Sequence, residues 1–96
     1  MEESFYEKSL KHFGIEDRAE KLIEEMAELM VELKHFKDNK TTVYNVIKEI
    51  ADVHVLLNTV AFYFDTLHIN QRIVDIELKV DAMIDAECRE SSRRRT

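Results

Sequence analysis

Apolar residues recur every three or four positions in four stretches of the chain, which is the spacing of amphipathic α-helices. The predicted helices run from Glu3 to Lys11, from about Glu16 to Phe36, from about Thr42 to Phe64 and from about Asn70 to Ile84. The two central helices are expected to pack through their apolar stripes. These stripes are Leu22, Met26, Leu29, Leu33 and Phe36 on the first, and Val46, Ile50, Val53, Leu57, Val60 and Phe64 on the second.

Residues that start or end helices lie between these stretches. Gly14, the only glycine, suits a helix C-cap, and Thr41 or Thr42 can cap the third helix. The other expected boundaries are a break at residues 38–40, a break at residues 65–68 and an N-cap at Asn70.

The composition favours helices throughout, because the chain has no proline and one glycine among 96 residues. The predicted fold class is all-α, a helical bundle built around an antiparallel hairpin of the two central helices. A chain this short buries a small fraction of its surface, so we expect oligomerisation to complete the bundle. Residues 1–90 are expected to form a single domain, and residues 91–96 a disordered tail.

Charge and cysteine content limit the binding partners and the cellular compartment that we expect. The formal net charge of −6 disfavours binding to nucleic acid, which needs a basic face. No apolar stretch approaches the roughly 20 residues of a membrane span. The single cysteine, Cys88, cannot form an internal disulfide, and the N-terminus lacks the apolar run of a signal peptide. We expect a cytoplasmic protein without a membrane partner.

The candidate chemistry lies in two pairs of carboxylates on the central helices. Glu25 and Glu28 form one pair and Glu49 and Asp52 the other, each pair three residues apart on one helical face. If the two helices pack antiparallel with a turn near residue 39, the pairs lie at the same level and on the same side. Four converging carboxylates repel one another unless cations neutralise them, and hard oxygen ligands select Mg²⁺, with Mn²⁺ as a substitute.

A simpler reading remains open, in which these residues are solvated helix faces, since acidic pairs three residues apart are common on amphipathic helices. Glu24 lies about 100° from Glu25 around the helix, and Glu32 lies seven residues beyond Glu25 on nearly the same face. Either residue can belong to the site or be solvated.

The two acidic stretches resemble the signature of the MazG-like all-α nucleoside triphosphate pyrophosphohydrolases. Residues 22–29 (LIEEMAEL) are similar to the first motif of that family, and residues 49–53 (EIADV) to the second, with twenty residues between Glu28 and Glu49. The aromatic-glycine step at residues 12–14 is similar to the segment before the first motif in small and phage-borne members.

The resemblance implies a helical hairpin within dimers or tetramers and cleavage of a (d)NTP between the α and β phosphates, giving (d)NMP and pyrophosphate. By position, it implies that Glu25, Glu28, Glu49 and Asp52 hold the metal, and that Glu24 either orients these ligands or helps to activate water. The expected substrate is a dNTP or a non-standard NTP, and the expected assembly is a homodimer or homotetramer.

Two further residues are candidates for substrate binding. Family members place basic groups on the last helix against the triphosphate, and Lys79 has a matching position, although Met83 stands where a second basic residue is expected. Asn58, near the apolar side of the third helix, can hydrogen-bond a sugar or base or lie in a subunit contact.

Two other functions compete with this one. Phosphoribosyl-ATP pyrophosphohydrolase has a similar size and a similar double acidic motif, but its fuller motif surroundings are absent here. The second rival is a helical oligomerisation or nucleotide-binding module without catalytic activity.

Overall fold

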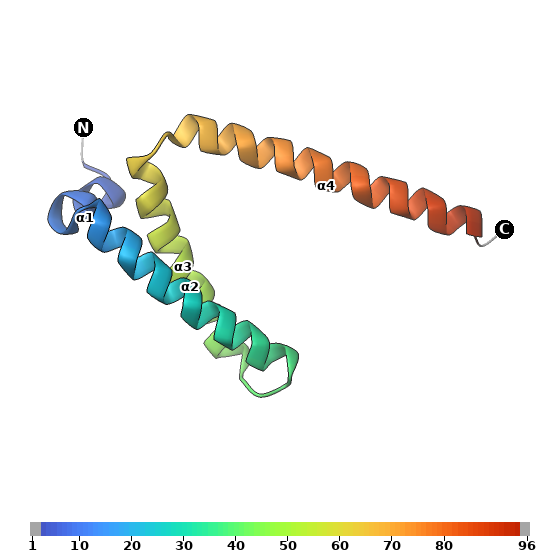
Figure 1. Cartoon of the computed structure of the whole chain (residues 1–96), viewed down its shortest axis with the longest axis horizontal. Coiled ribbons are helices and arrows are strands. Elements are labelled where there is room, and N and C mark those ends of the chain that lie inside the picture. The colour runs from blue at the N-terminus through green and yellow to red at the C-terminus, as the bar shows by residue number, and fades with distance from the viewer. Residues whose placement is uncertain (1–2, 95–96) are drawn as a thin grey trace. The chain divides into compact units, whose positions relative to one another are not determined.

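Four α-helices make up almost all of residues 3–94, which are the residues that this computed structural model describes (Figure 1). The helices are α1 (Phe5–Phe13), α2 (Ile15–Lys37), α3 (Val43–Tyr63) and α4 (Thr66–Arg94). No strand occurs among residues 3–94, so the predicted all-α class is confirmed. The structure divides into two compact units, residues 1–64 and residues 65–96, of which residues 3–64 and 65–94 are described. That residues 1–90 form one domain stays a prediction.

Local signals in the sequence explain where α1 ends and α2 begins. Ser4 caps α1, since its hydroxyl accepts a hydrogen bond from the Glu7 amide. Gly14 ends α1 by donating its amide to the Leu10 carbonyl, as predicted, and it also precedes α2. Its backbone has φ 87° and ψ 159°, a region that glycine alone enters easily.

The turn between α2 and α3 is built from short-range hydrogen bonds in the expected place. Asn39 takes a left-handed conformation (φ 59°), which asparagine tolerates better than most residues. The Asn39 amide donates to the Phe36 carbonyl and the Lys40 amide to the His35 carbonyl, the pair of bonds that closes a Schellman C-cap. Thr42 then caps α3 by accepting from the Asn45 amide.

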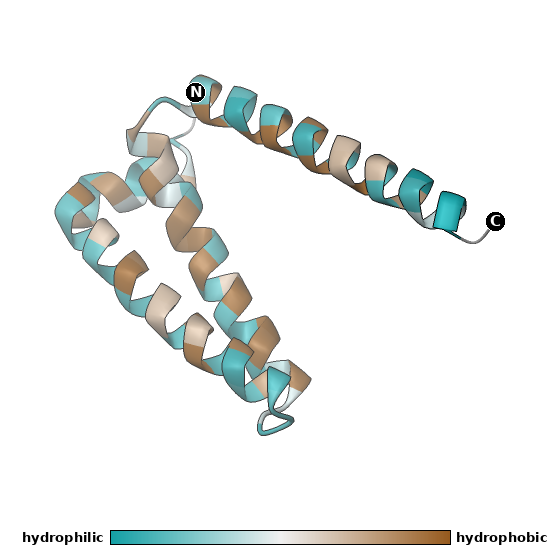
Figure 2. Ribbon diagram, turned by 45° about the vertical axis from the view of Figure 1, so that its right-hand side comes forward, coloured by the Kyte–Doolittle hydropathy of each residue, from teal (hydrophilic) through white to brown (hydrophobic). Residues whose placement is uncertain are grey.

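After this turn α3 returns alongside α2, and the two helices pack together along their length, with α1 against both (Figures 1 and 2). On α2 the stripe residue Leu22 is buried as predicted, but the packed face of α3 differs from its predicted stripe. On α3 the buried residues are Glu49, Leu56 and Thr59, whereas Ile50 and Leu57 are about half exposed. The packed face of α3 is therefore rotated from its stripe toward Glu49, and both stripes are left partly exposed.

The helix α4 begins four residues earlier and ends later than predicted. The sequence placed the N-cap at Asn70, but the Asp65 carboxylate accepts a hydrogen bond from the His68 amide, which starts the helix at Thr66. Residues 91–94, expected in the disordered tail, are helical, with an Arg94–Glu90 ion pair one turn apart. The rest of that predicted tail, residues 95–96, lies outside the described residues.

Far more apolar surface is open than a folded core would leave. Leu22 and Leu56 are the only large apolar side chains that are buried within residues 3–94, and α4 buries none of its residues. Figure 2 shows hydrophobic segments recurring along α2, α3 and α4. Within the same residues, no helix is both long enough and apolar enough to cross a membrane.

Candidate metal centre

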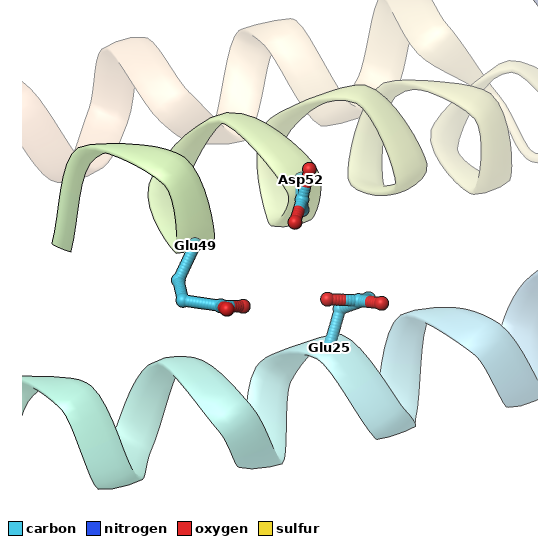
Figure 3. A group of neighbouring side chains, drawn as sticks. All are labelled: Glu25, Glu49 and Asp52. Atoms are coloured by element: carbon cyan, nitrogen blue, oxygen red, sulfur yellow. The ribbon is translucent and has the colours of Figure 1, made fainter. Parts of the chain in front are cut away.

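Three carboxylates converge between α2 and α3 (Figure 3). Glu25 extends from α2 toward Glu49 and Asp52, which lie one turn apart on α3. One oxygen from each of the three lies within 4.8 Å of the other two. Side chains 24 residues apart in sequence therefore meet because the turn at residues 38–42 brings the two helices together at matched level.

The two glutamates of this group are largely removed from solvent. The side chains of Glu25 and Glu49 are 12% and 11% exposed, while that of Asp52 is 42% exposed. Within the described part of the chain, Glu25 Oε2 and Glu49 Oε2 are buried with no hydrogen-bond partner. A buried carboxylate oxygen without a partner costs free energy, so a cation bound between the two helices would stabilise both atoms.

The geometry fits a small divalent cation. Octahedral Mg²⁺ has neighbouring ligands about 3 Å apart and opposite ligands about 4.2 Å apart at its usual bond lengths. The three oxygens lie within 4.8 Å of one another, so each pair needs to approach by no more than about 2 Å to share one such ion. All donors in the group are carboxylate oxygens, which suit Mg²⁺ and Mn²⁺ better than softer metals. The residues present therefore fit the metal that the sequence predicted.

Glu28, the fourth predicted ligand, lies beside this group and outside the three that converge. A hydrogen bond with Glu25, followed by charge repulsion from that residue, raises the pKa of Glu28 above its ordinary value. Repulsion from Glu49 adds to the same shift. Negative charges on both α2 and α3 therefore act on the Glu28 carboxyl group. Glu24 is exposed and pairs with Lys21 outside the group.

Two lysines that the sequence reasoning missed lie against the cluster. Lys21 Nζ is 3.4 Å from Glu25 Oε1, and Lys48 Nζ is 3.4 Å from Glu49 Oε1 and 3.8 Å from Asp52 Oδ2. The pKa of Lys21 is raised, mainly by the charge of Glu24, and that of Lys48 mainly by the charge of Glu49. The spacing of four residues between lysine and carboxylate on each helix was the signal that could have found them.

A shallow pocket of about 410 Å³ adjoins the cluster. Its lining combines three glutamates with two small or branched apolar residues: Ala27, Glu28, Val31, Glu32 and Glu49. Glu32, left undecided from the sequence, accepts a hydrogen bond of 2.6 Å from the Thr41 hydroxyl and so ties α2 to the turn before α3. Thr41 also accepts from the Asn45 side chain, so this network supports the turn that aligns the carboxylates.

The two predicted substrate-binding residues are on different helices, Asn58 on α3 and Lys79 on α4. Asn58 Nδ2 makes a long contact of 3.4 Å with the Tyr6 hydroxyl, linking α3 to α1. Lys79 is exposed on α4, in the second unit. Their roles toward a substrate stay predictions.

Comparison with known proteins adds no relative: no family model matches the chain, and no curated protein or solved structure matches it.

Proposed function

We propose that the protein is a Mg²⁺-dependent nucleotide pyrophosphohydrolase, which hydrolyses a (d)NTP between the α and β phosphates to (d)NMP and pyrophosphate. The observation that carries the proposal is the convergence of Glu25, Glu49 and Asp52 with two buried carboxylate oxygens that lack partners. The resemblance of both acidic stretches to the MazG-like motifs supplies the reaction class.

In this proposal Glu25, Glu28, Glu49 and Asp52 hold the metal, and Mn²⁺ can substitute for Mg²⁺. The cation supplies charge neutralisation at the phosphates and lowers the pKa of a coordinated water. Glu24 lies outside the converging group, and its exposed carboxylate is the proton acceptor that we assign to the attacking water. Lys79 and Asn58 remain candidates for contacts with the nucleotide.

The proposal includes a homodimer or homotetramer built around the α2–α3 hairpin. Support comes from the apolar residues that the seam leaves open, among them Leu33, Ile50 and Leu57, each about half exposed. Large apolar side chains left exposed in this number are typical of surfaces that contact other chains. Sedimentation velocity should find a dimer or tetramer, and a monomer at micromolar concentration would contradict this part of the proposal.

The test is pyrophosphate release from a panel of standard and modified NTPs and dNTPs, with phosphoribosyl-ATP included, in Mg²⁺, Mn²⁺ and EDTA. We expect release from at least one (d)NTP in either metal and none in EDTA. Glu49→Gln and Asp52→Asn should abolish it, whereas Glu20→Gln, at an exposed position on the same helix as Glu25, should not. Pyrophosphate release from phosphoribosyl-ATP alone would identify the protein as a phosphoribosyl-ATP pyrophosphohydrolase. No release from any compound of the panel would favour a module without catalytic activity.

A further inference from the structure

The lysines beside the cluster contact only one oxygen of each buried glutamate. Lys21 reaches Glu25 Oε1 and Lys48 reaches Glu49 Oε1, whereas the unpartnered atoms are the Oε2 oxygens of the same two residues. Each buried carboxylate thus has an outer oxygen facing an ammonium group and an inner oxygen without a partner. The same division recurs on two helices, one lysine from α2 and one from α3.

Both lysine side chains are about half exposed, whereas a group that serves only to neutralise a buried charge would be buried beside it. Their side chains are 46% and 56% exposed, and their distances to the carboxylates, 3.4 to 3.8 Å, exceed those of tight ion pairs. Two lysines also neutralise at most half of the formal charge of the four carboxylates. The ammonium groups are therefore loosely held and can reach another anion beside the carboxylates.

A polyphosphate needs such groups here. A nucleoside triphosphate stays negatively charged even with one Mg²⁺ bound, and it would approach a chain of net charge −6 at a cluster of carboxylates. Ammonium groups on both helices offset that repulsion, and a lysine binds phosphate as a flexible point charge.

We propose that Lys21 and Lys48 are the phosphate-binding residues of this site, one from each helix, and that they grip the polyphosphate of the metal–nucleotide complex. The inference rests on the proposed function and adds to it the residues that select a polyphosphate substrate. It implies opposite effects on two ligands. The positive charges oppose binding of a bare cation to the inner oxygens, and they favour binding of the anionic nucleotide.

The experiment uses Lys21→Gln, Lys48→Gln and the double variant of the full chain. Lys34→Gln is the control, because it removes the same charge from the same helix about 20 Å along the axis from Lys21. Mn²⁺ binding without nucleotide is measured by electron paramagnetic resonance. Binding of an α,β-methylene nucleoside triphosphate, which resists cleavage at that bond, is measured by calorimetry in saturating Mg²⁺.

We expect Mn²⁺ to bind about two- to fivefold more tightly to each single variant, since an opposing charge is gone. The analogue should bind about tenfold more weakly to each, and the KM for the substrate should rise by a similar factor while kcat changes less. Lys34→Gln should alter neither. A merely structural role would weaken both ligands together, and that result, or unchanged analogue binding, would overturn the inference.

The phosphate-binding role of the two lysines and the proposed function can be refuted separately. Metal-dependent pyrophosphate release by the wild type with unchanged analogue binding by the lysine variants would overturn the phosphate assignment and leave the proposed function standing. A wild type that neither binds Mn²⁺ nor releases pyrophosphate would overturn both.

Discussion

Replacing Glu49 by glutamine should stabilise the metal-free protein. The substitution keeps the shape of the side chain and removes one of two buried negative charges, whose oxygens lie within 4.8 Å of each other. At that distance the repulsion between Glu25 and Glu49 is about 1 kcal/mol for a fully solvated pair and about 3.5 kcal/mol at an effective dielectric constant of 20. The lost contact with half-exposed Lys48 offsets little of this, because solvent screens it. We expect a net gain of about 1–2 kcal/mol in the free energy of unfolding.

Mg²⁺ should make the wild type more stable to heat than Glu49→Gln, the reverse of the order in EDTA. In EDTA the midpoint of thermal unfolding of Glu49→Gln should exceed that of the wild type by about 4–8 °C per kcal/mol gained. In Mg²⁺ at one hundred times its dissociation constant, the wild type should gain about 2.7 kcal/mol, and the variant should gain little because it lacks a ligand. Circular dichroism at one fixed protein concentration measures both, since assembly makes the midpoint depend on concentration.

Glu20→Gln is the matched control, since it removes a glutamate charge at an exposed position and should shift neither midpoint appreciably. The reasoning would be refuted if Glu49→Gln were less stable than the wild type in EDTA, because the buried carboxylates would then be satisfied without a cation. It would also be refuted if Mg²⁺ stabilised both proteins equally.

Substitutions at three further positions test the site and the turns between its helices. The raised pKa of Glu28 means that the native state holds a proton more tightly than the unfolded chain, so the stability of the metal-free protein should fall as the pH rises from 4.5 through the raised value. Glu28→Gln should flatten that part of the thermal midpoint profile, and an unaltered profile would contradict the assignment. Gly14→Ala should cost about 1–3 kcal/mol because of the backbone conformation alone, since no atom lies within 4 Å of the added carbon; an unchanged urea midpoint would argue against that strain. Thr41→Val should cost about 1–3 kcal/mol by leaving the part-buried Glu32 carboxylate without its donor, whereas Thr41→Ser should keep the wild-type urea midpoint; equal losses in both would point to packing instead.

Helix class and most helix ends were predictable because they depend on short-range chemistry. Gly14 and Thr42 act as caps in the structure as the sequence indicated, since each needs only its neighbours to do so. The predicted start of α4 was wrong because the sequence offers two N-cap residues and the later one was chosen. Asp65 is as good an N-cap as Asn70, and it lies three residues before the amide that it accepts from.

The packed face of α3 could not be read from hydrophobicity alone. Ile50 and Leu57 belong to the longest apolar stripe yet stay half exposed, whereas Glu49 is buried. Periodicity shows which residues avoid water in the functional protein, and it does not say whether the same chain or another copy covers them. The convergence of Glu25 with Glu49 and Asp52 was predictable from matched level, but their lysine partners were missed because acidic residues alone were compared.

The most direct test of the central claim is to identify the products of nucleotide turnover by ³¹P nuclear magnetic resonance, with wild-type protein and Asp52→Asn in Mg²⁺ and in EDTA. We predict that the wild type in Mg²⁺ converts a (d)NTP into monophosphate and pyrophosphate, and that EDTA or the substitution prevents this. Formation of diphosphate and orthophosphate, or turnover that survives both EDTA and Asp52→Asn, would contradict a carboxylate-bound metal acting at the α–β bond.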